Sequence, residues 1–150
     1  MPAKPLSQQG GVALLEALIA ILIFSFGIIG LVGAQAAAIK SAGDAKLRTD
    51  ASYLAGQIIS RMWVDRANLA DYAHFTGGSN CAFTGGAAAS GNVTEWLGSA
   101  AQAGTVGYLP NGTAQIVVDS GTKLVTVTVC WRAPQETVTH NYATTALISG

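Results

Sequence analysis

The feature that most constrains this chain is an uncharged apolar run near its amino end. The run covers Ala17 to Ile39, 23 residues with the sequence ALIAILIFSFGIIGLVGAQAAAI. As an α-helix it would be about 34 Å long at 1.5 Å per residue, and about 30 Å is enough to cross the hydrocarbon core of a bilayer. The segment is therefore predicted to span or enter a membrane.

The chain as a whole is small and electrically neutral. Its 150 residues include eight Lys plus Arg and eight Asp plus Glu, so no basic excess attracts nucleic acid or anionic lipid from a distance. Only 11% of residues are charged, against roughly 25% in soluble domains, which excludes a charged disordered chain. We expect one small domain after the apolar run and no direct binding of nucleic acid.

A polar leader and one acidic residue precede the apolar run, in the sequence SQQGGVALLEALIAILIFSFGIIGL. This stretch resembles the class III signal of type IV prepilins, in which a short leader ends in Gly, a hydrophobic residue follows and Glu lies at the fifth position after the cut. The resemblance implies that residues 1–11 are removed by cleavage between Gly11 and Val12, and that Glu16 is the family's acidic residue. A cut after Gly10 is the alternative and would place Glu16 one position late.

The spacing of Val12 and Glu16 also has a direct physical meaning. Cleavage before Val12 would create an ammonium group one helical turn from the Glu16 carboxylate, so that the two charges can neutralise each other. The simpler alternative places Glu16 in the headgroup layer, where the helix dipole favours a negative charge. The family resemblance implies further that the Val12 amine is methylated, and that it meets the Glu16 of a neighbouring subunit during assembly.

After Ile39 the pattern becomes amphipathic, and no Pro interrupts it. Apolar residues recur at steps of three, four and seven, as expected for one face of a helix: Leu47, Ala51, Leu54, Ile58, Met62 and Leu69. We predict one long helix from about Val12 to about Tyr72, with a transmembrane and assembly half over 12–39 and an amphipathic half over 40–72.

Three glycines, Gly27, Gly30 and Gly33, interrupt the apolar half. One interpretation is close helix packing, because Gly30 belongs to a small-residue stripe with Ala34, Ala37 and Ser41. The other follows from the family resemblance, since pilin helices locally unwind near Gly or Pro in the filament. Both interpretations imply neighbouring helices.

Residues 73–150 are predicted to form a globular α/β region. Its first part, 73–112, is a Gly-rich connecting loop with a short helix around 94–103 and without the context of a phosphate-binding loop. Three β-patterned segments follow at 114–118, 123–132 and 137–148, and their short connections predict an antiparallel meander. In the middle segment we expect one set of side chains to face the amphipathic helix and the alternate set to face the loop: Val125, Val127, Val129 and Trp131 against Leu124, Thr126, Thr128 and Cys130.

The cysteines and histidines indicate a structural role and no chemistry. Cys81 and Cys130 are predicted to form a disulfide if the domain lies in an oxidising compartment, the alternative being two unrelated buried thiols. His74 and His140 are the only imidazoles, and neither lies in a metal-binding pattern. The sequence contains no nucleophile elbow or similar motif that would bring Ser, His and Asp together. We expect no catalytic residues, no metal, no cofactor and no enzymatic activity.

Taken together, the fold class is predicted to be α+β, with a long N-terminal helix packed on a C-terminal antiparallel sheet, and it resembles a type IV pilin. Within that superfamily, ALLEALIAILIFSFGIIGLVGAQ followed by ASYLAGQIISRM resembles the minor pilins of the PilV type, over about residues 8–64. The resemblance implies processing by a prepilin peptidase and a single-pass stage in the inner membrane with a periplasmic domain. It also implies incorporation into a surface pilus with the major pilin and other minor pilins, where it would act in pilus initiation. Adhesion, twitching motility and DNA uptake are the downstream roles found in the family.

Two other classes of protein share parts of this pattern. A type II secretion pseudopilin would have the same leader and helix. A membrane-anchored or secreted periplasmic binding domain would instead be uncleaved, or would be cut after Ala34 so that Gln35 becomes the first residue.

Overall fold

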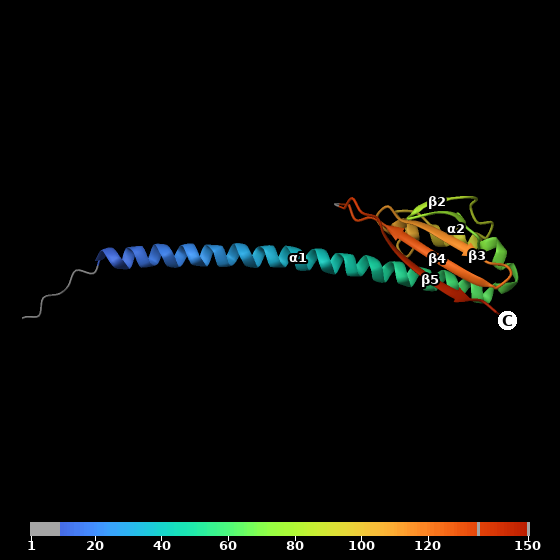
Figure 1. Cartoon of the computed structure of the whole chain (residues 1–150), viewed down its shortest axis with the longest axis horizontal. Coiled ribbons are helices and arrows are strands. Elements are labelled where there is room, and N and C mark those ends of the chain that lie inside the picture. The colour runs from blue at the N-terminus through green and yellow to red at the C-terminus, as the bar shows by residue number, and fades with distance from the viewer. Residues whose placement is uncertain (1–9, 135, 150) are drawn as a thin grey trace, which may run out of the picture. The chain divides into compact units, whose positions relative to one another are not determined.

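The computed structural model describes residues 10–134 and 136–149 (Figure 1). The chain divides into two units, residues 1–42 and residues 43–150. The predicted α+β fold class is confirmed, since a long apolar helix precedes two small antiparallel sheets. The elements in chain order are α1 (Gly10–Val64), η1 (Arg66–Tyr72), β1 (Gly77–Ser79), β2 (Ala82–Thr84), α2 (Gly91–Leu97), η2 (Val106–Tyr108), β3 (Thr113–Val118), β4 (Leu124–Trp131) and β5 (His140–Leu147).

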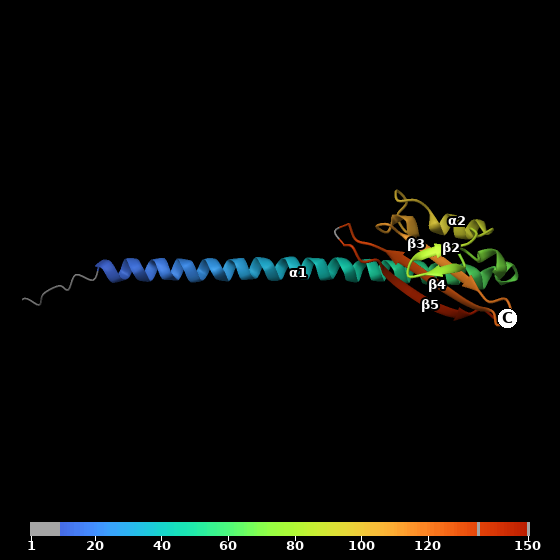
Figure 2. The same ribbon diagram turned by 45° about the horizontal axis from the view of Figure 1, so that its top comes forward.

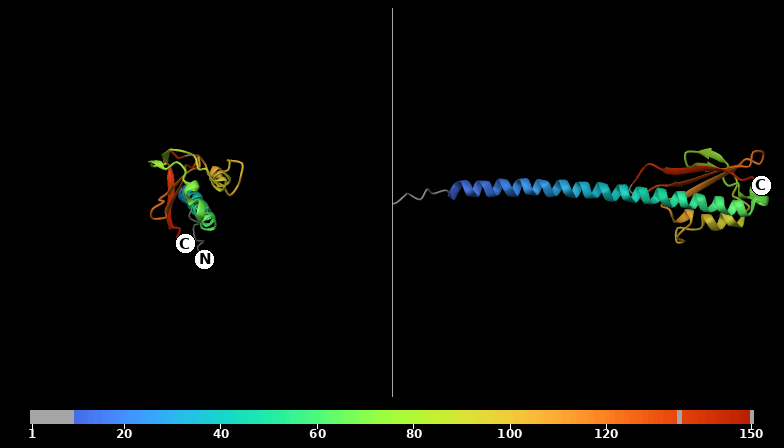
Figure 3. Two further views of the ribbon diagram at one scale, coloured as in Figure 1. Left: turned by 90° about the vertical axis from the view of Figure 1, so that its right-hand side faces the viewer. Right: turned by 90° about the horizontal axis from the view of Figure 1, so that it is seen from below.

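The main sheet of the second unit confirms the predicted meander. Its strand order is β3-β4-β5, and both pairs are antiparallel, with Thr113 opposite Cys130 and Leu124 opposite Leu147. The part of α1 that belongs to this unit lies between the sheet and α2 (Figure 3). The third strand begins at His140 and not at the predicted residue 137, because residues 137 and 138 form a bend before pairing begins.

The core of this unit contains the predicted face of the amphipathic helix. Ala51, Leu54, Ile58, Met62 and Leu69 are buried, and Leu47 packs against them. From the sheet, Val125, Val127, Val129 and Trp131 join the same cluster, as their alternation in β4 predicts. Of the opposite set, Leu124 is exposed, Thr126 and Thr128 are half-buried, and Cys130 is buried.

The predicted extension of the long helix to Tyr72 is wrong at its end. The α-helix stops at Val64, and residues Arg66–Tyr72 form a 3-10 helix that is kinked at Asn68. Asp65 has a non-helical backbone, and its carboxylate accepts hydrogen bonds from the Asn68 side-chain amide at 2.7 Å and the Tyr72 hydroxyl at 3.1 Å. A carboxylate that bonds to nearby groups in this way competes with helix continuation.

The Gly-rich segment holds more structure than the sequence indicates. A hairpin, β1 and β2, turns at Asn80 and Cys81, which both have positive φ angles. It lies on the face of the main sheet opposite α1 (Figure 3). The short helix is α2 at Gly91–Leu97 and not around 94–103. It ends at Gly98, which has a φ of +52°; a Cβ added there would lie only 2.5 Å from the Thr105 side chain, so glycine is required.

Candidate functional site

The apolar part of α1 is the most unusual surface of the molecule. Every residue from Val12 to Ala42 is exposed within the chain, including large side chains such as Phe24, Phe26 and Ile29. The helix is long and apolar enough to cross a membrane, and no part of its most apolar stretch is buried. An α-helix satisfies its own backbone hydrogen bonds, so such a segment is stable in hydrocarbon. The same length and composition fit a membrane anchor and a signal sequence.

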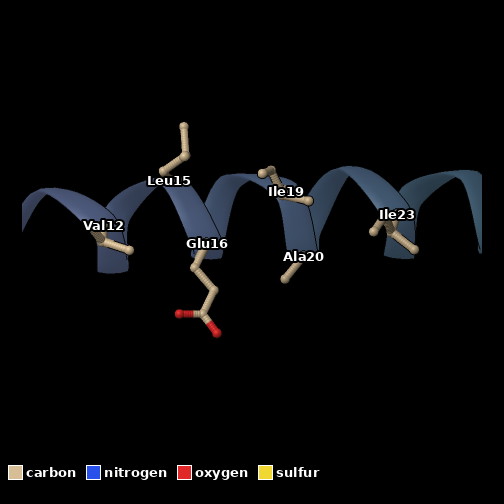
Figure 4. A pocket seen from close by; sticks show the side chains of 6 residues that line it. All are labelled: Val12, Leu15, Glu16, Ile19, Ala20 and Ile23. Atoms are coloured by element: carbon tan, nitrogen blue, oxygen red, sulfur yellow. The ribbon is translucent and has the colours of Figure 1, made fainter.

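At the amino end of this segment, Glu16 stands among apolar side chains (Figure 4). Its carboxylate projects away from the helix, on a shallow surface lined by Val12, Leu15, Glu16, Ile19, Ala20 and Ile23. Val12 precedes Glu16 by four residues, so both lie on one side of the helix, one turn apart. Among the residues that the structure describes, no group forms an ion pair or hydrogen bond with the Glu16 carboxylate. The charge that would neutralise Glu16 therefore has to come from elsewhere.

The predicted processing site lies partly within the described residues. Gly10, Gly11 and Val12 are in the first turn of α1. Residues 1–9 of the predicted leader lie outside the described residues. The structure thus places the Gly11–Val12 bond at the start of the helix, and the cut itself stays a prediction.

The apolar segment contains two other polar side chains, and neither of them is charged. Between Val12 and Ile39 these are Ser25 and Gln35. The Ser25 hydroxyl donates to the Ile21 carbonyl at 2.7 Å, a bond within the helix that satisfies the hydroxyl without a partner chain. Glu16 is consequently the one charged group whose burial in a membrane or a helix bundle has to be balanced.

The three glycines of the segment have no packing role inside the chain. A methyl group placed on Gly27, Gly30 or Gly33 would meet no atom within 4 Å. By contrast, a side chain at Gly112 in the folded unit would collide with the Val106 carbonyl. Nothing in the described part of the chain therefore requires glycine at positions 27, 30 and 33, although each weakens the helix by about 1 kcal/mol relative to Ala. The helix remains continuous through all three positions.

The predicted disulfide between Cys81 and Cys130 is confirmed. Cys81 lies in the turn of the β1–β2 hairpin, and Cys130 is buried near the end of β4. The bond joins residues that are 49 positions apart in the sequence and fixes the hairpin over the sheet. The Gln115 side-chain amide adds to this attachment by donating to the carbonyls of Phe75 and Gly77 at 2.7 Å and 2.9 Å.

The two histidines have structural contacts. His74 is buried, its Nδ1 accepts a hydrogen bond from the Ala88 backbone N–H at 3.1 Å, and burial lowers its pKa from the usual 6.5. His140 lies at the start of β5, with Nε2 2.7 Å from a carboxylate oxygen of Glu136. Within the described residues there is no group of three or more His, Cys, Asp or Glu side chains that could hold a metal ion.

A polar network at the end of α1 was not predicted from the sequence. Arg61 forms an ion pair with Glu95 at 2.9 Å, and the Asn92 amide donates to the Tyr72 hydroxyl at 2.6 Å. Burial raises the pKa of Tyr72, while its bond from Asn92 acts in the opposite direction. These residues join α1, η1 and α2. The signal that could have indicated them is weak, because 31 residues or more separate Arg61 from α2 partners.

Comparison of the chain with protein-family models, with curated proteins and with solved structures finds no match. The function proposed below therefore rests on the residues of this chain.

Proposed function

We propose that this chain is a structural subunit of a type IV pilus, a minor pilin of the PilV type that takes part in pilus initiation with other minor pilins. The observation that carries the proposal is the exposed apolar helix with one charge, Glu16, on the side of Val12. A membrane can cover this surface before assembly, and the helices of neighbouring subunits can cover it afterwards. Cleavage after Gly11 would supply the ammonium group that balances Glu16.

The low dielectric constant among apolar helices explains why Glu16 would need an opposite charge during assembly. An isolated carboxylate among apolar helices is costly, and an opposite charge from an adjacent subunit removes much of that cost. A subunit that is displaced along the filament axis would lose this pairing, so the Val12 amine and Glu16 define an axial register. The glycines at positions 27, 30 and 33 would allow close approach of neighbouring helices or local unwinding.

The test is incorporation into filaments with and without the Glu16 charge. Glu16→Ala should leave membrane insertion intact and reduce the amount of the chain in sheared surface filaments by at least about tenfold, the equivalent of 1.4 kcal/mol. Ser25→Ala is the matched control, because it removes a polar group of the same segment whose bond stays within the helix. Wild-type incorporation of Glu16→Ala would contradict the proposal.

Recovery of the chain with secretion components, and not with pilus subunits, would instead favour a pseudopilin of type II secretion. An uncleaved or Gln35-initiated protein that never enters filaments would favour a periplasmic binding domain.

A further inference from the structure

We infer that β5 is an acceptor edge, to which an extended strand of a different protein is added. The main sheet has two outer strands, β3 and β5, which differ in the backbone hydrogen bonds on their outer sides. β3 is bridged near its middle, where Ile116 and His74 exchange two backbone hydrogen bonds, each 2.9 Å long. β5 is paired with β4 on one side only.

The direction of the backbone groups in β5 follows from its last ladder bond. The Ile148 N–H donates to the Lys123 carbonyl at 3.0 Å. Because hydrogen-bonded and non-hydrogen-bonded pairs alternate in an antiparallel ladder, even-numbered residues of β5 direct their N–H and C=O groups at β4. The odd-numbered residues direct theirs away from the sheet: Asn141, Ala143, Thr145 and Leu147. Nothing in the described part of the chain forms a hydrogen bond with these outward backbone groups.

This edge lacks the features that protect natural edge strands from pairing. Such edges are usually short, or carry charges, Pro or bulges. β5 is eight residues long, HNYATTAL, and pairs with β4 without a bulge. It contains no Lys, Arg, Asp, Glu or Pro. A long uncharged edge with outward backbone groups specifies an extended polypeptide segment as its ligand.

The side chains along β5 indicate which residues the added strand should contain. Asn141, Ala143 and Thr145 are small or uncharged and exposed, so they leave room for a neighbouring strand. At the carboxyl end, Leu147 is 54% exposed beside its cross-strand partner Leu124, which is 42% exposed. We expect an uncharged strand of at least four residues, with an apolar side chain that covers these leucines.

The choice of a different protein over a second copy rests on the proposed function. Two copies could pair antiparallel through β5, but the twofold axis would reverse one molecule relative to the other. Within residues 43–149, β5 runs roughly along the end of α1 (Figures 1 and 2). Such a pair would place residue 43 of the two folded units at opposite ends of the pair. Subunits of one membrane enter it through the chain that precedes residue 43, so these residues are expected on the same side. A strand from a different filament subunit has no such conflict.

Hydrogen exchange of the wild-type chain tests this inference. Amides of Asn141, Ala143, Thr145 and Leu147 should exchange fast in the detergent-solubilised full chain and at least about tenfold more slowly in filaments. Amides of Tyr142 and Thr144 are the internal controls, since their ladder bonds to β4 are present in both states. Equal, fast exchange of the four outward amides in filaments that contain the chain would overturn the inference and leave the proposed function standing. Concentration-dependent protection in the solubilised chain alone would assign the edge to a second copy and also overturn it.

A pair of variants provides an independent measurement. Ala143→Pro removes an outward N–H and no bond to β4, a position where edge strands tolerate Pro. Ala143→Thr keeps the N–H and is the matched control. We expect at least about tenfold less Ala143→Pro in filaments, with its disulfide and thermal unfolding unchanged. Incorporation of a folded Ala143→Pro at the wild-type level would overturn the inference. Absence of the wild-type chain from filaments would overturn the proposed function and the inference together.

Discussion

The two units of this chain differ in where their apolar side chains lie. Residues 43–149 bury their apolar side chains against one another, in a cluster that includes Ile58, Trp96 and Val127. Residues 12–42 bury none of theirs. The second unit therefore has a core of its own, whereas the first is long and apolar enough to cross a membrane and leaves its apolar surface uncovered by the described part of the chain.

The same charge placed in each of the two units should have very different effects. Ile58→Lys puts an ammonium group into a fully buried site and should destabilise the folded unit by about 5 kcal/mol or more. Ile28→Lys should leave thermal unfolding of that unit unchanged and should impair membrane insertion by about 3 kcal/mol. Thermal unfolding and membrane fractionation of both variants check the prediction. Equal effects of the two variants on unfolding would show that the units are not independent.

The disulfide should stabilise the second unit alone, because both of its cysteines lie in that unit. Replacing Cys81 and Cys130 together by Ser should destabilise that unit by about 4 kcal/mol on the chain-entropy estimate for a loop of this length. The β1–β2 hairpin should become protease-sensitive first, since the bond holds its turn. Limited proteolysis and chemical denaturation measure the two effects. Helicity of the apolar segment in detergent should not change.

A smaller effect distinguishes two tryptophans of the folded unit. The Trp96 indole N–H donates to the Leu54 carbonyl at 2.9 Å and is buried, whereas Trp63 is 43% exposed. Trp96→Phe should cost about 1 to 2 kcal/mol through the lost hydrogen bond and the altered packing. Trp63→Phe should change the free energy of unfolding by less than about 0.5 kcal/mol. A similar loss in both variants would contradict the assignment of α2 to the core.

The smallest expected effect is a dependence of stability on pH through His74. Burial lowers its pKa in the folded state, so the unfolded chain binds the proton more readily. The stabilisation is therefore complete above the unfolded pKa of about 6.5 and is lost as the pH falls below it toward the folded value. His74→Gln should flatten this part of the curve, and His140→Gln serves as the control. Chemical denaturation between neutral and mildly acidic pH measures it, and an unchanged slope in His74→Gln would exclude His74 as the cause.

The parts of the fold that sequence predicts well are those with long, regular patterns. The alternation through β4 places Val125, Val127 and Val129 in the core, and the helical spacing of Leu54, Ile58 and Met62 does the same for α1. The β1–β2 hairpin escapes prediction because its strands have three residues each and are rich in Gly. The helix end at Val64 depends on the contacts of the Asp65 side chain, which no periodicity indicates.

For the candidate site, local sequence supplies the residues but not their partners. The spacing of Val12 and Glu16 puts them on one side of the helix, and the structure agrees. The open edge of β5 is different, because it depends on which strand lies outermost and on the contact of His74 with Ile116 across 42 residues of sequence. Such an edge can be recognised only after the sheet order is known.

The most direct test of the central claim is the amino-terminal sequence of the chain recovered from sheared surface filaments. The account predicts that the recovered chain begins at Val12, which leaves an ammonium group one turn before Glu16. A filament-bound chain that retains residues 1–11 would contradict it, because Glu16 would then have no terminal amine to pair with.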